Sequence, residues 1–397
     1  MPRVLIDISR LLGRLMQGRL PTGVDRVGLA YAAHYRHSEH SEVRAVLTER
    51  EVSAVLSAAD SRHAFDLLLS EAAHPESSRS KARRLVWKAR LWSWMRNDFE
   101  VRGSILINTG HRGLEHPRHA QSLRNKGVRP VFFIHDLIPV THPAFCRDGE
   151  QATHMARLRN AMAWGCGIIT NSHDTRGQLL GLARAQGWPA RPVLAAPLGS
   201  AALPRAPAAR LLAADYFVML GTIEPRKNHA LMLDVWRQLA QRMQAACPTL
   251  VVIGQGGWKS DAVMAQLRSG ALPHVMYLEN CSDVALAAWL QHARALLFPS
   301  HAEGYGLPLV EALALNLPVV ASDLPVFREI AGNTPDYASP HDGAQWLELV
   351  MDHAGAGSPR RAAQAGRIKG FRIPQWADHF AAVDRFIGDI AAQGAKQ

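Results

Sequence analysis

The sequence predicts an α/β protein made of two domains, each built around a parallel sheet. Its 397 residues exceed what one hydrophobic core usually organises, because domains typically contain about 100–200 residues. Short β-branched runs alternate with longer amphipathic segments, which is the pattern of βαβ units. The Pro- and Ala-rich segment 197–210 lies between two halves of similar size, and we interpret it as a linker.

The predicted strands are short, mostly apolar runs. They are 4–8, 43–47, 105–108, 130–134 and 167–171 in the first half, and 216–220, 249–253, 275–278, 295–298 and 318–321 in the second. Helical patterns lie between them, for example at 23–35 and 151–164. No strand end carries the Gly-x-Gly-x-x-Gly fingerprint, and the nearest sequence, GQGG at 254–257, lacks the third glycine spacing. A dinucleotide-binding protein is therefore not favoured.

The composition excludes several classes of protein. Hydrophobic residues make up 48% and charged residues 20%, which is a globular composition. No window approaches the roughly 18 uninterrupted apolar residues of a membrane span. The first ten residues, MPRVLIDISR, carry charges at Arg3 and Asp7 and are interpreted as a strand, not as a signal peptide. The four cysteines form no Cys-x-x-Cys pair, which fits a reducing compartment, so we expect a cytoplasmic protein.

The surplus of basic over acidic residues lies in the N-terminal half. The formal net charge is +11; residues 1–200 contain 28 basic and 17 acidic residues, whereas residues 201–397 contain 17 of each. Segment 79–102, RSKARRLVWKARLWSWMRNDFEVR, combines eight basic residues with three tryptophans. This mixture suits an anionic membrane surface, which the protein would meet from the inner face of the cytoplasmic membrane. The basic residues are poorly segregated on a helix, so a solvated helix with its aromatics packed inward remains open. No recognised motif indicates nucleic acid.

Two loops of the second half carry charges where ligands of parallel sheets bind. The stretch 298–321, FPSHAEGYGLPLVEALALNLPVVA, places Glu303, two glycines and then Glu311 between a strand and a helix, with Glu311 expected in the first turn. The turn 221–228, GTIEPRKN, presents Arg226 and Lys227. Glycine lets backbone N–H groups approach an anion, so the two loops together suit a diphosphate. Taken singly, Glu311 is better explained by a helix-dipole role worth about 0.3–1 kcal/mol, and the two cations by a solvated loop.

These motifs resemble a family of glycosyltransferases. Glu303 and Glu311 form an E-x7-E pair inside AEGYGLPLVEALA, preceded by LFPS and followed by PVVASD, as in retaining family 4 enzymes of the GT-B fold. The turn GTIEPRKN is similar to a branch of bacterial O-antigen and capsule sugar transferases that includes mannosyltransferases. In the first half, TGVDRV at 22–27 resembles the family's first loop and His135-Asp136 its middle-strand histidine. FRIPQWADHFAAVDRF resembles its final helix.

The resemblance implies a fold and a division into domains. The expected fold class is α/β of the GT-B type, with two Rossmann-like domains facing across a cleft and a C-terminal helix crossing back. Residues 1–204 would form the acceptor-binding domain and 205–374 the nucleotide-sugar-binding domain. Residues 375–397 would form a helix that packs on the N-terminal domain.

The resemblance also implies roles for individual residues. Glu311 would hold the ribose hydroxyls, Glu303 the donor sugar, and Lys227 with Arg226 the diphosphate. The expected catalytic residues are Glu303, His135, Lys227 and Arg226. The expected donor-binding residues are Glu311, Gly23, Gly221, Thr222, Gly304, Tyr305, Gly306 and Leu307. Thr222 stands where the family often has Arg.

The function implied is transfer of a hexose from a nucleotide-sugar to a glycan or lipid-linked glycan during surface polysaccharide synthesis. The donor would be GDP- or UDP-linked, with GDP-mannose suggested by the branch, and no further cofactor is expected. No Asp-x-Asp occurs and no His/Asp cluster has ligand spacing, so we expect no metal ion. Two alternatives stay open: a GT-B-fold nucleotide-sugar epimerase, and a catalytically silent nucleotide-sugar-binding protein.

Overall fold

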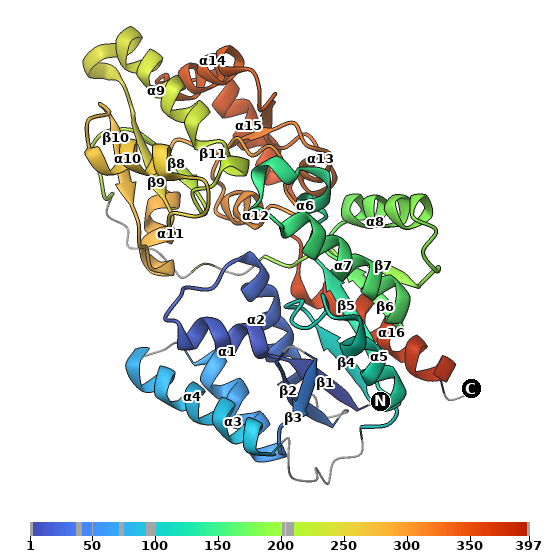
Figure 1. Cartoon of the computed structure of the whole chain (residues 1–397). Coiled ribbons are helices and arrows are strands. Elements are labelled where there is room, and N and C mark those ends of the chain that lie inside the picture. The colour runs from blue at the N-terminus through green and yellow to red at the C-terminus, as the bar shows by residue number, and fades with distance from the viewer. Residues whose placement is uncertain are drawn as a thin grey trace. The chain divides into compact units, whose positions relative to one another are not determined.

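The computed structural model divides into two compact units (Figure 1). It describes residues 3–36, 42–49, 51–70, 75–92, 101–200, 203 and 210–394, and within 75–92 the side chains of 79–88. The first unit comprises Met1–Leu137, Gln151–Leu198 and Trp376–Gln397. The second comprises Ile138–Glu150 and Gly199–Gln375. Most of the segment interpreted as a linker lies outside the described residues.

The first unit is built on a mostly parallel sheet. In the described part of the chain this sheet has seven strands in the order β3-β2-β1-β4-β5-β6-β7, and only β2 and β3 pair antiparallel. The strands are β1 Val4–Asp7, β2 Val43–Glu49, β3 Val52–Val55, β4 Ile105–Asn108, β5 Arg129–Ile134, β6 Gly167–Thr170 and β7 Val193–Ala195. The helices are α1 Ser9–Met16, α2 Gly23–Arg36, α3 Ala58–Leu69, α4 Pro75–Trp92, α5 Pro117–Asn125, α7 Glu150–Trp164, α8 His173–Ala185 and α16 Trp376–Gly394. β1, β4 and β6 are buried along their whole length, as parallel strands covered on both faces must be.

The C-terminal helix α16 packs on α2 inside the first unit. The Tyr31 hydroxyl lies 3.0 Å from Nε2 of His379, and the Tyr35 hydroxyl donates to Asp384 at 2.7 Å. The His34 ring stacks on Phe380 with centroids 3.9 Å apart. These contacts join segments more than 340 residues apart in the sequence.

The second unit repeats the architecture with a fully parallel sheet. Over the described residues it has six strands in the order β10-β9-β8-β11-β12-β13. The strands are β8 Tyr216–Leu220, β9 Thr249–Ile253, β10 Val275–Leu278, β11 Leu296–Phe298, β12 Val319–Ser322 and β13 Asp336–Ala338. The α-helices are α6 Ile138–Thr141, α9 His229–Met243, α10 Asp261–Ser269, α11 Asp283–Gln291, α12 Leu307–Ala314, α13 Pro325–Ala331, α14 Gly343–Ala354 and α15 Pro359–Lys369. Single 3₁₀ turns occur at Pro143–Phe145, Pro225–Lys227 and Gln244–Ala246.

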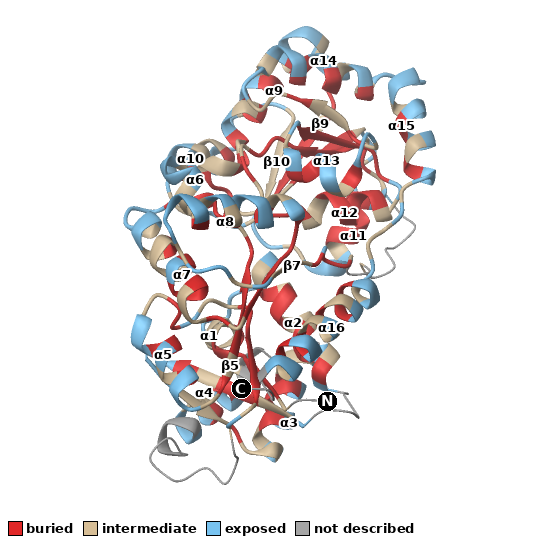
Figure 2. Cartoon of the chain, turned by 90° about the vertical axis from the view of Figure 1, so that its right-hand side faces the viewer, coloured by how far each residue is buried: buried red, intermediate tan, exposed pale blue. Residues whose placement is uncertain are grey.

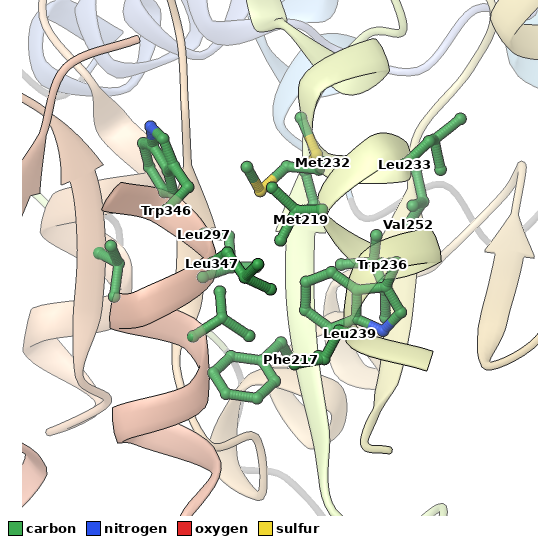
Figure 3. Close-up of a cluster of buried hydrophobic side chains, with 14 of the residues drawn as sticks. Phe217, Met219, Met232, Leu233, Trp236, Leu239, Val252, Leu297, Trp346 and Leu347 are labelled. Carbon is green, nitrogen blue, oxygen red and sulfur yellow. The ribbon is translucent and has the colours of Figure 1, made fainter. Parts of the chain in front are cut away.

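Apolar packing on one face of this sheet fixes α9 and α14. Trp236 of α9 and Trp346 of α14 are fully buried among side chains from β8, β9 and β11 (Figure 3). Both indoles keep a hydrogen bond, since Trp236 donates to the carbonyl of Pro248 and Trp346 to that of Ser339, each at 2.9 Å. The central strands of both sheets are coloured as buried in Figure 2, whereas edge strands such as β10 are intermediate.

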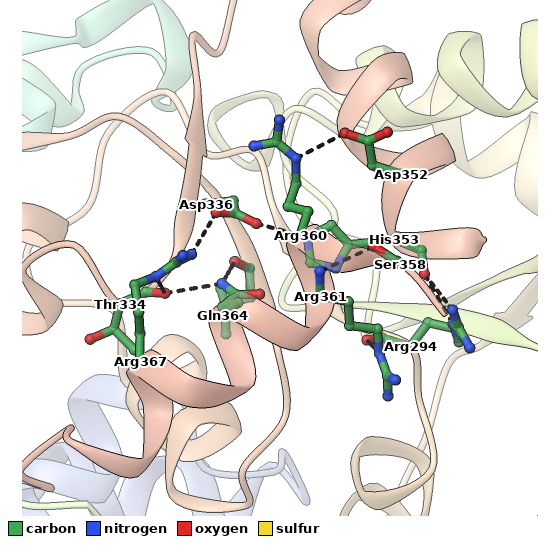
Figure 4. Close-up of polar contacts among 11 residues, drawn as sticks. Arg294, Thr334, Asp336, Asp352, His353, Ser358, Arg360, Arg361, Gln364 and Arg367 are labelled. Carbon is green, nitrogen blue, oxygen red and sulfur yellow. Dashed lines mark hydrogen bonds and ion pairs between the residues drawn. The ribbon is translucent and has the colours of Figure 1, made fainter. Parts of the chain in front are cut away.

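A polar network holds α14 and α15 against the edge strand β13. His353 is fully buried, and its Nε2 lies 2.9 Å from Asp336, whose other oxygen accepts from Arg367 at 2.6 Å (Figure 4). The carbonyl of His353 accepts from Arg294. A buried ionic group requires such partners, so we interpret this network as structural.

The predicted architecture of two parallel-sheet α/β domains is confirmed. Every predicted strand is present within two residues of its expected bounds. The sequence did not predict β3, β7 and β13, which are edge strands of three or four residues. The two units divide the chain differently from the predicted domains, because residues 138–150 and the chain from Gly199 onward group with the second unit, although the first domain was expected to run to 204.

Candidate functional site

The strand order of the second unit marks one edge of its sheet as a ligand site. β8 pairs with β9 on one side and with β11 on the other. From β8 the chain adds β9 and β10 on one side of the sheet and then returns to add β11, β12 and β13 on the other, so the strand order reverses between β8 and β11. Ligands of open α/β sheets bind outside the carboxyl ends of the strands at such a reversal. The loops that leave these two ends are 221–228 and 299–306.

Backbone geometry brings the two loops together. Gly221 has φ 139°, and a Cβ there would lie 3.3 Å from Cε of Lys227, so glycine leaves room for the lysine side chain. The first turn then closes as the 3₁₀ helix Pro225–Lys227 and enters α9 through Asn228, which has a left-handed φ of 60°. The Asn228 amide donates to the carbonyl of Pro299 on the second loop at 3.2 Å.

Four charged side chains meet between these loops. Glu303 Oε1 lies 2.6 Å from Lys227 Nζ and 2.8 Å from Arg226 Nη1. Arg226 also donates to Glu224 through Nε at 2.9 Å and to the carbonyl of Ala302 at 2.8 Å. All four side chains are at least four-fifths buried. The cluster thus pairs two acidic side chains with two basic ones.

The neighbouring charges decide the ionisation of Glu303. Burial by itself would raise the pKa of its carboxyl, but Arg226 and Lys227 outweigh burial and lower that pKa to about 2. Burial dominates at Glu224 and raises its pKa, although Arg226 and Lys227 act in the opposite direction. Burial also lowers the pKa of Lys227, opposed by Glu303. Glu303 is thus an ionised carboxylate at neutral pH, held in a buried site.

The second glutamate of the pair lies deeper than the sequence suggested. Glu311 is buried at 2% exposure, and because α12 begins at Leu307 it occupies the second turn, not the expected first turn. A helix dipole acts chiefly within one turn, so this position disfavours the dipole role. Gly306 precedes α12 with φ 111°, and a Cβ there would lie 2.7 Å from the Phe327 ring. Gly304 and Tyr305 of the same loop are buried, whereas Leu307 and Thr222 are half-buried.

The first unit holds the remaining predicted residues. Gly23 is the exposed first residue of α2, next to Thr22, whose backbone N–H donates to buried Asp25 at 2.8 Å. His135 follows β5 directly, is 5% exposed, and donates from Nε2 to the carbonyl of Thr109 at 2.8 Å. Asp25 pairs with Arg10 at 2.8 Å.

Two further histidines lie beside His135. The His111 ring is 5.3 Å from that of His135 and 6.0 Å from that of His154. Each Nε2 donates to a backbone carbonyl, Phe133 for His111 and Asp136 for His154. Burial lowers the pKa of His135 to about 4 and the pKa of His111 well below its ordinary value, so both rings are neutral at pH 7. Among the described residues, no group of three or more His, Cys, Asp or Glu side chains could hold a metal ion.

Comparison with protein families places the site in a known domain. Residues 210–338 match the family model described as Glycosyl transferases group 1. The second unit contains a group 1 glycosyl transferase domain. This domain includes every charged residue of the cluster around Glu303, and Glu311 lies inside it as well.

The chain is similar to two mannosyltransferases of Escherichia coli. The chain is 32% identical over 276 residues to serotype-specific mannosyltransferase WbdA of Escherichia coli, covering 62% of this chain and 33% of that protein. It is 27% identical over 240 residues to O-antigen chain mannosyltransferase B of Escherichia coli, covering 56% of this chain and 62% of the other. The chain thus spans only about a third of the length of WbdA.

A solved structure supports the fold of the whole chain. Anabaena HepE in complex with UDP and glucose aligns over 100% of this chain and 99% of its own, with a TM-score of 0.63 at 16% identity. The GT-B fold expected from the resemblance is therefore confirmed. Within the described residues, no helix is both long and apolar enough to cross a membrane.

Two features of the glycosyl transferase domain escaped the sequence reasoning. Glu224 lies in the quoted turn GTIEPRKN, yet its burial and its pairing with Arg226 appear only in three dimensions. His229 begins α9 at 3% exposure, and burial together with Lys227 lowers its pKa to about 3. In the first unit, the grouping of His111 and His154 with His135 was also missed, because sequence spacing gives no hint of it.

Proposed function

We propose that this protein is a retaining, metal-independent glycosyltransferase. It transfers a hexose, with mannose from GDP-mannose as the favoured donor, to a glycan or lipid-linked glycan in surface polysaccharide synthesis. The observation that carries the proposal is the pairing of Arg226 and Lys227 with Glu303 at the strand reversal of a group 1 domain. The mannosyltransferase relatives support the sugar, and the family resemblance supports retention through front-face attack without a covalent intermediate.

The cations have a defined task in this reaction. Breaking the glycosidic bond of a nucleotide-sugar leaves a diphosphate, whose negative charge grows in the transition state. A lysine ammonium about 4 Å from the leaving oxygen contributes up to about 4 kcal/mol at an effective dielectric near 20, partly offset by desolvation. That corresponds to at most about three powers of ten in rate. Lys227 and Arg226 are already held in place by Glu303 and Glu224, so little reorganisation is needed.

A transfer assay tests the function and separates it from the alternatives. Purified protein is incubated with GDP-mannose or UDP-hexoses, first alone and then with mannose-containing glycans. We expect a lengthened glycan and free nucleoside diphosphate only when an acceptor is present, with the anomeric configuration retained by NMR. A converted donor without acceptor indicates the epimerase, and binding without turnover indicates the silent protein.

Metal independence is a separate prediction. Fixed cations at the diphosphate supply the charge that Mg²⁺ or Mn²⁺ supplies in other transferases. We expect transfer activity to persist in excess EDTA, measured against the same reaction with Mg²⁺ added. Activity that vanishes in EDTA and returns with Mg²⁺ or Mn²⁺ contradicts the prediction.

We also propose that the first unit meets an anionic membrane surface. Over the described side chains of α4, Lys81, Arg83, Arg84 and Lys88 are exposed, and Trp87 is 66% exposed. Ala82 and Leu85 face inward and are buried. Within residues 79–88 the exposed basic side chains and Trp87 are thus separated from buried Ala82 and Leu85, and a lipid-linked acceptor would be reached at such a surface.

A further inference from the structure

A short segment of the first half belongs to the donor-binding unit. Residues 138–150, which we name the strap, contain α6 and the 3₁₀ turn Pro143–Phe145, and they group with the second unit although the chain on either side belongs to the first. Ile138 and Cys146 of the strap are 8% and 6% exposed and pack with Ala302 in a small apolar cluster. Ala302 directly precedes Glu303.

The strap contacts two separate loops of the second unit. The Phe145 ring stacks on His301, with centroids 4.7 Å apart and planes 15° apart. The carbonyl of Phe145 accepts a hydrogen bond of 2.7 Å from Nε1 of Trp258. Arg147 adds a cation–π contact at 5.2 Å from the Trp258 ring. His301 lies on the loop after β11 and Trp258 on the loop after β9, so Phe145 links the two.

These contacts continue into the charged cluster. The backbone N–H of His301 donates to the carbonyl of Arg226 at 2.8 Å, and Arg226 donates back to the carbonyl of Ala302 at 2.8 Å. The loop after β9 reaches the same turn, because the backbone N–H of Gly257 donates to the carbonyl of Ile223 at 2.9 Å. The strap therefore touches both loops that frame the turn carrying Arg226 and Lys227.

We propose that Phe145 and Trp258 are positioning residues for the donor diphosphate site. The loops after β9 and β11 lie beyond their strands and are joined to the turn 221–228 by a few backbone hydrogen bonds, and the strap adds side-chain contacts that hold both loops in place for the donor. Ordering a loop in advance removes an entropic penalty from binding. This inference rests on the proposed function, since it takes the ligand to be a nucleotide diphosphate. Neither residue touches the reacting groups, and each acts through His301, Ala302 or the turn at Gly257.

The first test uses a matched pair of tryptophans. Trp258→Phe removes the indole N–H from Phe145, and Trp236→Phe removes an equivalent indole–carbonyl bond from the core of the same unit. We expect Trp258→Phe to weaken GDP or UDP binding by roughly two- to tenfold and to raise the KM for donor more than it lowers kcat. Trp236→Phe should lower Tm with nucleotide affinity unchanged. Equal affinity in wild type and Trp258→Phe overturns the proposal.

The second test concerns the ring of Phe145. Phe145→Ala removes the stack on His301, whereas Phe145→Tyr retains it, so the tyrosine variant should rescue nucleotide affinity. Amide hydrogen exchange of the loops 254–260 and 299–306 should be faster in Phe145→Ala and Trp258→Phe than in wild type. Unchanged exchange in both variants shows that the strap only adds stability. If the wild-type protein binds no nucleotide, the proposed function is overturned, and the proposed role of the strap is rejected as a consequence.

Discussion

Lys227 combines burial with two favourable contacts for its charge. It is 7% exposed, its Nζ lies 2.6 Å from Glu303, and the same atom lies 4.6 Å from the centre of the Phe298 ring. Both the carboxylate and the aromatic face favour the ammonium form. In the proposed function, a diphosphate at this site would share the cation with Glu303, so Glu303 would both hold Lys227 in position and lie beside the donor.

Glu311 and Glu303 are expected to differ in their effects on binding. Glu311→Ala removes a buried carboxylate that accepts ribose hydroxyls in our proposal, and such charge-assisted bonds are worth about 1.5–3 kcal/mol. We expect nucleotide affinity to fall by roughly tenfold to a hundredfold in calorimetric titration. Glu303→Ala should reduce turnover more than it reduces GDP or UDP affinity.

The control is Glu348→Ala, which removes an exposed glutamate from α14 of the same unit. It should leave nucleotide affinity at the wild-type value. Unchanged affinity in Glu311→Ala would show that Glu311 has only a structural role in α12.

At the scale of single residues, the sequence identified most of the candidate site residues but did not show which groups surround them in the fold. Both loops, 221–228 and 299–306, could be found from the sequence because each is a contiguous motif. The spacing of Glu303 and Glu311 and the order of the neighbouring motifs marked their positions. The partner of Arg226 was missed, since Glu224 becomes significant only when buried beside it. The strap was missed for the same reason: the contact between Phe145 and His301 spans more than 150 residues of sequence.

The packing of α16 on β6 requires a glycine at the start of β6. Gly167 begins β6, and a Cβ there would lie 2.5 Å from Cδ1 of Ile390 and 2.7 Å from Cζ of Phe386. Real Cβ atoms do not approach other atoms so closely, so alanine would push α16 outward or force off-rotamer side chains.

We therefore expect Gly167→Ala to lower the free energy of unfolding by about 1–3 kcal/mol, measured by urea denaturation. Gly177→Ala in α8 provides the matched control, because a Cβ there meets nothing within 4 Å. Alanine in a helix interior is favoured over glycine by up to about 1 kcal/mol, so the control should be neutral or stabilised. Equal stability of Gly167→Ala and wild type would contradict the packing of α16 on β6.

The sequence predicted the central strands well because they are buried on both faces, and it also predicted the half-exposed edge strand β10, whose four residues VMYL form an apolar run. Central strands such as β4 and β9 are continuous apolar runs, and their observed bounds match the prediction to the residue. The edge strands β3 and β13 are half-exposed, so their sequences lack a sustained apolar run. Their pairing depends on a neighbouring strand that local sequence does not identify.

On the scale of the whole molecule, charge is distributed unequally between the two halves. The surplus of 11 positive charges lies entirely within residues 1–200. Near an anionic surface each Lys or Arg contributes about 1 kcal/mol, and this contribution decays within a Debye length. The strong family motifs lie in the neutral second half, so composition and motif indicate separate tasks for the two halves.

We expect the wild-type protein to sediment with anionic vesicles at low salt and to detach at physiological salt. A variant with Arg83, Arg84 and Lys88 changed to Ser removes three exposed charges next to Trp87 and should sediment much less. The matched control changes Arg242, Arg268 and Arg360 to Ser, which lowers net charge equally on exposed positions of the second unit. If net charge alone drives adsorption, both triple variants lose binding to the same extent, whereas a local surface on α4 predicts loss only in the first. If wild type fails to sediment at low salt, the basic excess does not serve a membrane, and an acidic acceptor becomes the partner to test.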